Sequence, residues 1–375
     1  MNTKNDKKIT KHNLIRAVLV CFASLSVFSC VDNNDNAKSG VRIKPEGQNP
    51  AWAPNIDPEM LAVIEQLDKL NPTPLTEKSV EAARNSPTPK DAVQALMTKY
   101  NITPVPPKVT MTERMIKGPA TDSLQVRIYT PQTNKTSYPV IVYYHGGGWV
   151  IANPEVYEAS TQGLSEKAEA IVVSVNYRKA PENKFPAAHE DAYAAYQWAR
   201  MNSHTIKGDT TKVAVAGESA GGNLAASVCL MARSQGFPMP VHQLLVYPIA
   251  NYNFESPSYQ QYANAKPLSK PLMQWFFMHY LNSPAEGNNP LISLLNAEAT
   301  GLPSATVLTA EIDPLLSEGK AYADKLSAAG VDVSYRNYEG VTHEFFGMAA
   351  VVPDAMDAQE FASGKLKETF NKIQN

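Results

Sequence analysis

The stretch that decides the fold is Gly217-Glu218-Ser219-Ala220-Gly221. An alternating apolar run at 212–216 leads into it as a predicted strand, and small residues at 222–228 leave it in a helical pattern. A strand that turns this sharply into a helix strains the backbone of the central serine, and side chains at Gly217 and Gly221 would collide. The turn lifts the Ser219 hydroxyl clear of the sheet, at a helix N-terminus where backbone N–H groups favour negative charge. A chemically silent Gly/Ser turn is the alternative.

The rest of the chain predicts an α/β fold around that turn. Apolar runs indicate strands at 109–116, 124–129, 140–144, 171–177, 213–216, 244–247, 305–310 and 331–338. Helical patterns alternate with them at 156–169, 187–202, 220–235, 317–329 and 355–373. The central strands are nearly continuous apolar runs, as in strands covered on both faces, so we predict a mostly parallel sheet flanked by helices. The first two strands are expected to form an antiparallel pair.

The N-terminus predicts a targeting segment over residues 1–30. An apolar core at 17–28 is shorter than the roughly 20 residues of a transmembrane helix. The core is preceded by the basic residues Lys4, Lys7, Lys8, Lys11 and Arg16. It ends in Val27-Phe28-Ser29-Cys30, which resembles a bacterial lipobox. We expect a lipid on Cys30 to anchor the protein in the bacterial envelope, at the outer membrane or the periplasmic face. A soluble periplasmic or secreted protein is the alternative.

Three further segments follow the targeting segment. Residues 31–50 are rich in Pro, Asn and Gly and predict a flexible polar linker. Residues 51–107 carry three helical patterns and predict a helical cap, with Asp57 expected to cap the first helix. Residues 108–375 form the predicted α/β domain. An extra apolar helix at 272–281 interrupts its alternation and is assigned to the cap.

Composition argues against several other classes of protein. The formal net charge of the 375 residues is −2, and no Lys/Arg cluster occurs outside the N-terminus, so we expect no nucleic-acid partner. Of three cysteines, only Cys229 falls in the α/β domain, so no internal disulfide is expected there. We interpret Cys229, on the helix after Ser219, as a buried and inert thiol.

A serine hydroxyl is a weak nucleophile, so it needs a base and an acid that orients the base. His343 follows the last predicted strand and is the candidate base. Asp313 follows the strand at 305–310 and is the candidate acid; it could also cap the next helix. The order Ser, Asp, His along the chain is the one that a nucleophile on such a turn predicts. Weaker candidates for the acid are Asp332, at the wrong end of the sheet, Glu311 and Glu318.

A glycine-rich loop follows the strand at 140–144 and reads His145-Gly146-Gly147-Gly148-Trp149. Glycines let backbone N–H groups point at an oxyanion, and the donors that we predict belong to Gly146, Gly147 and Ala220. A phosphate-binding loop is the rival interpretation, but no Gly-Lys-Ser/Thr ending or GxGxxG pattern follows. His145 is expected to brace the loop and not to bind a metal ion, because no second metal-binding side chain stands at ligand spacing.

Taken together, these motifs resemble the hormone-sensitive-lipase-like group of bacterial carboxylesterases, which have the α/β-hydrolase fold. The segments that carry the resemblance are His145–Gly148 (the family's HGGG), 217–223 (GDSAGG), 176–188 (DYRLAPE…FPAA), 313–315 (DPL) and 343–345 (HGF). The chain departs from the family with Asn176 for Asp, Glu218 for Asp and Glu344 for Gly. The resemblance covers roughly residues 51–375.

The resemblance implies a small ester substrate with a short acyl chain, an acyl-serine intermediate, and neither a metal nor an organic cofactor. Two alternatives remain open at this point. An amidase or deacetylase could use the same residues, with His343 protonating a leaving amine. A catalytically silent binding lipoprotein could share the fold.

Overall fold

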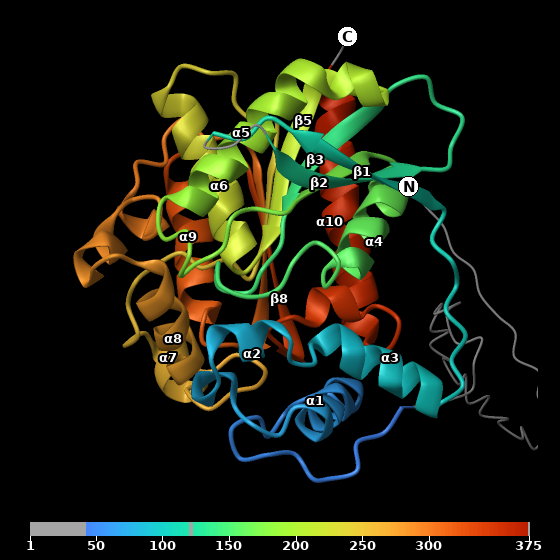
Figure 1. Ribbon diagram of the computed structural model, residues 1–375, viewed down its shortest axis with the longest axis vertical. Coiled ribbons are helices and arrows are strands. Elements are labelled where there is room, and N and C mark those ends of the chain that lie inside the picture. Colours follow the sequence, from blue (N-terminus) through green and yellow to red (C-terminus); the bar gives the residue numbers. More distant parts are fainter. Residues whose placement is uncertain (1–42, 120–122, 374–375) are drawn as a thin grey trace, which may run out of the picture. The chain divides into compact units, whose positions relative to one another are not determined.

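An eight-stranded sheet runs through the computed structural model, which describes residues 43–119 and 123–373 (Figure 1). The sheet order is β1-β2-β4-β3-β5-β6-β7-β8. β1 pairs antiparallel with β2 and β2 with β4, whereas the other neighbours are parallel. The strands are β1 (Val109–Ile116), β2 (Leu124–Pro131), β3 (Tyr138–Tyr144), β4 (Ile171–Val175), β5 (Gly208–Glu218), β6 (Gln243–Val246), β7 (Ala305–Ile312) and β8 (Val333–Thr342). The predicted mostly parallel sheet is confirmed.

Helices cover both faces of this sheet. One face carries α5 (Ala187–Asn202), α6 (Ala220–Ser234) and α9 (Leu316–Ala328), and the other α4 (Glu158–Ala168) and α10 (Pro353–Lys372) (Figure 1). β3 shows why: Val140 and Val142 point into one core, Ile141 and Tyr143 into the other. Cys229 is buried in α6, as predicted, and burial raises the pKa of its thiol. Over the described residues, no helix is both long and apolar enough to cross a membrane.

The cap segment forms α1 (Pro58–Leu70), a 3-10 turn (Leu75–Glu77), α2 (Val80–Arg84) and α3 (Pro89–Lys99), which gather at one end of the sheet (Figure 1). α1 contacts β8, and α3 contacts the 3-10 turn Phe345–Met348. α8 (Lys270–Tyr280) contacts the 3-10 turn Leu75–Glu77. Asn55, just before α1, also donates to Glu311 of β7, so the cap lies where β7 and β8 end.

The predicted helix cap at Asp57 is wrong in one respect. Asp57 occupies the N-cap position of α1, but its side chain makes no capping hydrogen bond. Its backbone N–H donates to Gly340 O at 2.8 Å, and its carboxyl group faces that of Asp354. Burial and the Asp354 charge raise the pKa of Asp57 to about 6. The Asp57 carboxyl group therefore interacts with Asp354 of α10 and not with the backbone N–H groups of α1.

The predicted segments 1–30, with Cys30, and 31–42 of the linker lie outside the described residues. Residues 43–50 form no helix or strand, yet they pack on the cap. Ile43 is buried, and the Glu46 carboxylate pairs with Lys69 and Lys99. This part of the predicted linker is held by the cap.

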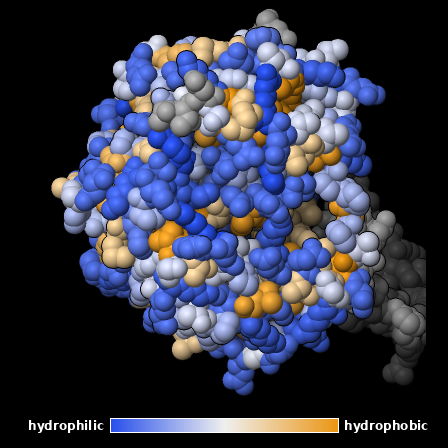
Figure 2. Space-filling model, in the orientation of Figure 1, coloured by the Kyte–Doolittle hydropathy of each residue, from blue (hydrophilic) through white to orange (hydrophobic). Residues whose placement is uncertain are grey.

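The surface carries hydrophobic residues in small groups among hydrophilic ones on the face shown in Figure 2. The exposed large hydrophobic side chains are Leu70, Val105, Met111, Met115, Met201 and Met278, and of these only Met111 and Met115 share an element, β1. Such scattered residues are ordinary for a folded domain.

Candidate active site

The serine turn has the geometry that its sequence predicts. β5 ends at Glu218, α6 begins at Ala220, and Ser219 between them has φ 57° and ψ −120°. A positive φ at a residue other than glycine strains the backbone by about 1–3 kcal/mol. Backbone hydrogen bonds hold it: Ser219 N–H donates to Val246 O at 2.9 Å, and Ser219 O accepts from Asn223 N–H at 3.1 Å and from Ile249 N–H at 3.2 Å.

The flanking glycines are required, as predicted. A Cβ at Gly217 would collide with the carbonyl of Gly221, and a Cβ at Gly221 with the carbonyl of Tyr144. Ser219 is only 3% exposed. Over the described residues its Oγ has no hydrogen-bond partner, which leaves the hydroxyl free to interact with a ligand.

Strand register brings the other two predicted residues together. β7 and β8 pair so that Ile312 lies opposite Thr342, each one residue before a candidate. His343 Nδ1 therefore lies 2.6 Å from Asp313 Oδ2, with both side chains buried. The second oxygen, Asp313 Oδ1, accepts from Leu315 N–H at 2.9 Å. Asp313 thus both holds the turn before α9 and orients the imidazole.

The charge state of His343 follows from this pair. Burial lowers the pKa of His343, but the Asp313 charge and hydrogen bond outweigh it, so the pKa lies above the usual 6.5. The ring also packs on Tyr247, with 4.5 Å between the ring centres. The imidazole is therefore fixed in orientation and can accept a proton readily.

The weaker candidates for the acid make other contacts. Asp332 is 78% exposed and lies 3.9 Å from Lys372. The two glutamates bind groups other than histidine: Glu311 accepts from Asn55 and Gly340, and Glu318 from the backbone N–H groups of Ala250 and Asn251. Of these four acids, Asp313 is the one that contacts His343.

The glycine loop lies directly beside the serine turn. β3 and β5 pair with Tyr144 opposite Gly217, and a Cβ at Gly146 would come within 3.1 Å of Glu218 O. Gly147 has φ 94°, a conformation that L side chains rarely adopt. A Cβ at Gly148 would collide with the Phe276 ring of α8. The three glycines therefore allow the serine turn and α8 to approach the loop closely.

His145 braces this loop. Its ring stacks on Tyr177 with 4.2 Å between centres, and its Nδ1 lies 2.7 Å from Gly146 O. The Tyr177 hydroxyl donates to His145 O at 2.8 Å. Burial lowers the pKa of His145 to about 3, so the ring is neutral. The described part of the chain holds no group of three His, Cys, Asp or Glu side chains that could bind a metal ion.

Sequence reasoning missed two carboxyl groups, one buried behind the turn and one beside His343. Glu218 is fully buried and accepts hydrogen bonds from the Tyr143 and Tyr247 hydroxyls. Burial and the charge of Glu344 raise the pKa of Glu218 to about 7. Glu344 itself has φ 72° and accepts from the Tyr157 hydroxyl at 2.6 Å. The signal was present, because both glutamates depart from the residues of the resembling family.

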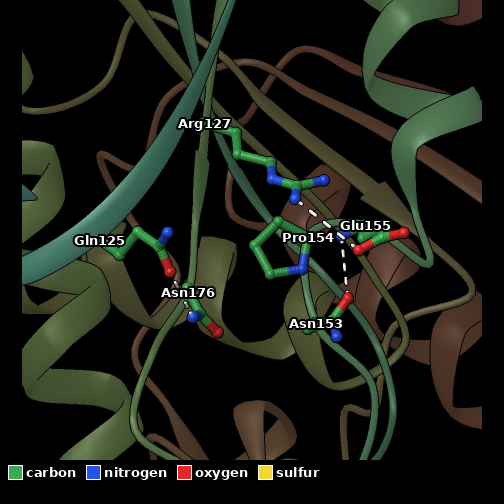
Figure 3. Close-up of a pocket in the computed structure, with 6 residues that line it drawn as sticks. All are labelled: Gln125, Arg127, Asn153, Pro154, Glu155 and Asn176. Carbon is green, nitrogen blue, oxygen red and sulfur yellow. Dashed lines mark hydrogen bonds and ion pairs between the residues drawn. The ribbon is translucent and has the colours of Figure 1, made fainter. Parts of the chain in front are cut away.

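Two cavities lie apart from these residues. One of about 100 Å³ contains an Arg127–Glu155 ion pair at 3.7 Å (Figure 3). Its walls are Gln125, Arg127, Asn153, Pro154, Glu155 and Asn176. A second, of about 400 Å³, lies along α8, where Phe277 also packs on Trp149 of the glycine loop. Neither cavity is lined by Ser219, Asp313 or His343.

Known proteins are similar to this chain in sequence and in fold. A family model described as alpha/beta hydrolase fold matches residues 141–347. Carboxylesterase NlhH of Mycobacterium tuberculosis is 36% identical over 269 residues, 71% of this chain and 84% of that protein. Ethyl acetate hydrolase of Pseudomonas putida is 33% identical over 237 residues, which cover 62% of this chain and 74% of the relative.

A solved structure agrees. The thermostable esterase from Pseudomonas putida ECU1011 superposes with a TM-score of 0.77 at 33% identity, covering 85% of this chain and 98% of that one. The length of the matches, their identity and the shared fold lead to one assignment. The chain belongs to the α/β-hydrolase family and, within it, to the hormone-sensitive-lipase-like carboxylesterases.

Proposed function

We propose that this ester hydrolase cleaves short-chain esters through an acyl-enzyme on Ser219, with His343 as general base and Asp313 as the acid that orients it. The observation that carries the proposal is the 2.6 Å contact between His343 Nδ1 and Asp313 Oδ2, formed at the ends of neighbouring strands. The strained conformation of Ser219 supports it, because strain of this kind gathers at functional sites.

The chemistry proceeds in two halves. Ser219 Oγ attacks the ester carbonyl while its proton passes to His343 Nε2, and Asp313 stabilises the imidazolium that forms. The imidazolium then protonates the leaving alcohol. Water attacks the acyl-serine with the same base, which releases the acid and restores the serine. Backbone N–H groups of the glycine loop and of Ala220 are the proposed donors to the oxyanion.

Aromatic packing supports a short acyl chain. The Phe276 ring lies against Gly148, and Trp149 stacks on Tyr280 with 4.4 Å between ring centres. These buried rings pack against the glycine loop, which favours a small acyl group there. The name of one relative, ethyl acetate hydrolase, denotes a small ester.

A labelling experiment tests the nucleophile. Wild type should react with a fluorophosphonate probe and hydrolyse 4-nitrophenyl acetate, whereas Ser219→Ala should do neither while remaining folded. Ser234→Ala is the matched control, because Ser234 is an exposed serine at the end of the same helix. Normal turnover by Ser219→Ala would end the proposal.

Substrate series test the finer claims. Over 4-nitrophenyl esters of increasing length, kcat/KM should be highest for short acyl chains and then fall. A steady rise to long chains would indicate a lipase instead. Turnover of 4-nitroacetanilide as fast as the acetate ester would favour the amidase alternative.

We also propose that Cys30 carries a lipid that anchors the enzyme in the bacterial envelope. The support is the sequence Val27-Phe28-Ser29-Cys30 after a basic region and a short apolar core. More than one acyl chain on the cysteine would anchor stably, since one chain is marginal. Detergent phase partitioning should place wild type in the detergent phase and Cys30→Ser in water. Both in water would refute the anchor and leave the esterase proposal intact.

A further inference from the structure

A second carboxyl group stands beside the atom of His343 that would carry the proton. Glu344 Oε1 lies 4.0 Å from His343 Nε2, on the side of the imidazole away from Asp313. The Glu344 side chain is 18% exposed, whereas that of His343 is 3% exposed. The Glu344 side chain is therefore partly open to solvent, whereas that of His343 is almost fully buried.

A hydrogen bond holds the Glu344 side chain in this place. Its Oε1 accepts from the Tyr157 hydroxyl at 2.6 Å, and the backbone of Glu344 has φ 72°. That hydroxyl in turn lies against Gly146, because a Cβ there would collide with it. Through Tyr157, the carboxyl group thus connects the loop that carries His343 with the glycine loop.

The charge of Glu344 is not cancelled by a basic residue. Across the described chain, no lysine or arginine forms an ion pair with it, and His343 is the one histidine that does. Its second oxygen, Oε2, accepts no hydrogen bond in that region and is not among the fully buried unpaired atoms. One oxygen is therefore free to meet a cation.

We infer that Glu344 determines specificity, favouring esters whose alcohol portion carries a positive charge close to the ester oxygen. The inference rests on the proposed function. In it, the leaving oxygen takes its proton from His343 Nε2 and so lies about 3 Å from that atom. Since Glu344 Oε1 is 4.0 Å from the same atom, the leaving oxygen comes within about 7 Å of the carboxylate. A cation two carbons beyond that oxygen can reach it.

A pair of matched substrates tests the inference. 2-(Trimethylammonio)ethyl acetate carries the cation, and 3,3-dimethylbutyl acetate is its neutral isostere. The ratio of their kcat/KM values should fall about tenfold from wild type to Glu344→Gln. The ratio cancels any effect of the substitution on His343, because both substrates use the same base.

Two further variants secure the result. Glu339→Gln removes the same charge from an exposed residue of β8 and should keep the wild-type ratio. Glu344→Gly suits the positive φ, so it covers the case in which Glu344→Gln does not fold, and it should lower the ratio as well.

The outcomes separate the two proposals. A lower ratio in the Glu344 variants and an unchanged one in Glu339→Gln support the inference. Equal ratios in all the proteins overturn it while the esterase proposal stands. A wild-type protein that hydrolyses neither substrate nor 4-nitrophenyl acetate overturns both.

Discussion

Replacing Glu218 by glutamine should make stability less dependent on pH. The Glu218 carboxyl group is fully buried and accepts hydrogen bonds from the Tyr143 and Tyr247 hydroxyls. Burial is the largest influence, followed by the Glu344 charge, and together they raise the pKa of Glu218 from its usual 4.5 to about 7. Hydrogen bonds from the two tyrosines lower the pKa of Glu218, but by less than burial and the Glu344 charge raise it. Glutamine keeps the shape of the side chain and cannot ionise.

The sign of the effect follows from proton linkage. In the unfolded chain the Glu218 carboxyl loses its proton near pH 4.5, whereas the native protein keeps it until about pH 7. Between these values the native state binds more protons, so the free energy of unfolding falls as pH rises. A pKa difference of about 2.5 corresponds to about 3 kcal/mol, all of it lost above pH 7 to 8.

Urea unfolding of wild type and Glu218→Gln from pH 5 to pH 8.5 measures how much Glu218 contributes to the pH dependence of the free energy of unfolding. The variant should gain about 2.5 kcal/mol relative to wild type across that range, because a small part of the effect already appears below pH 5. Groups such as His343 titrate in both proteins, so the difference between the two curves isolates Glu218. Parallel curves would refute the reasoning, because they would mean that native Glu218 is ionised throughout and that the tyrosines prevail over burial.

Three other predictions follow from the site and the cap. Because His343 must be neutral to accept a proton and its pKa is raised, kcat/KM should rise with pH along a limb above pH 6.5; Asp313→Asn should move the limb to lower pH, and an unmoved limb would contradict the pair. Gly147→Val should lower kcat by about 10²–10³, because position 147 has φ 94° and a shifted N–H no longer serves the oxyanion; an unchanged kcat would place the donors elsewhere. Asp57→Asn should raise the free energy of unfolding in urea by about 1 kcal/mol at pH 7 and leave it unchanged below pH 4. The reason is that burial and the Asp354 charge raise the pKa of Asp57 to about 6, while solvent screens part of the effect. Equal gains at both pH values would contradict this reasoning.

Features set by local sequence or by strand order could be predicted. The turn at Ser219 needs glycine on both sides, and this requirement is written in the pentapeptide itself. The candidates Asp313 and His343 could be found because each directly follows a strand, and parallel neighbours end at the same edge. The register that pairs Ile312 with Thr342 then places the two side chains in contact.

Features that depend on a distant partner could not be predicted. Asp57 looked like a helix cap, but the carboxyl group of Asp354 competes for it in the folded chain. Glu344 meets Tyr157 across 187 positions of sequence, and no local pattern announces that contact. The composition of residues 43–50 is typical of a flexible linker. The side chains that hold this segment, such as Lys69 of α1 and Lys99 of α3, lie far from it in the sequence, so no local pattern shows the contact.

The two glutamates that depart from the family are coupled in space, and this decides which of them carries charge. The Glu344 charge raises the pKa of Glu218, so ionising both at once is costly. Glu218 is sealed behind the turn with two hydroxyl groups, whereas Glu344 is partly exposed and lies 4.0 Å from the basic nitrogen of His343. Burial raises the pKa of Glu344 as well, but the charge of His343 and the Tyr157 hydroxyl act to lower it. The charge therefore costs less on Glu344, and the proton is expected on Glu218. We therefore expect Glu218, next to the proposed nucleophile, to support the turn as a neutral acid, and Glu344, after the proposed base, to be the one that offers a negative charge to a substrate.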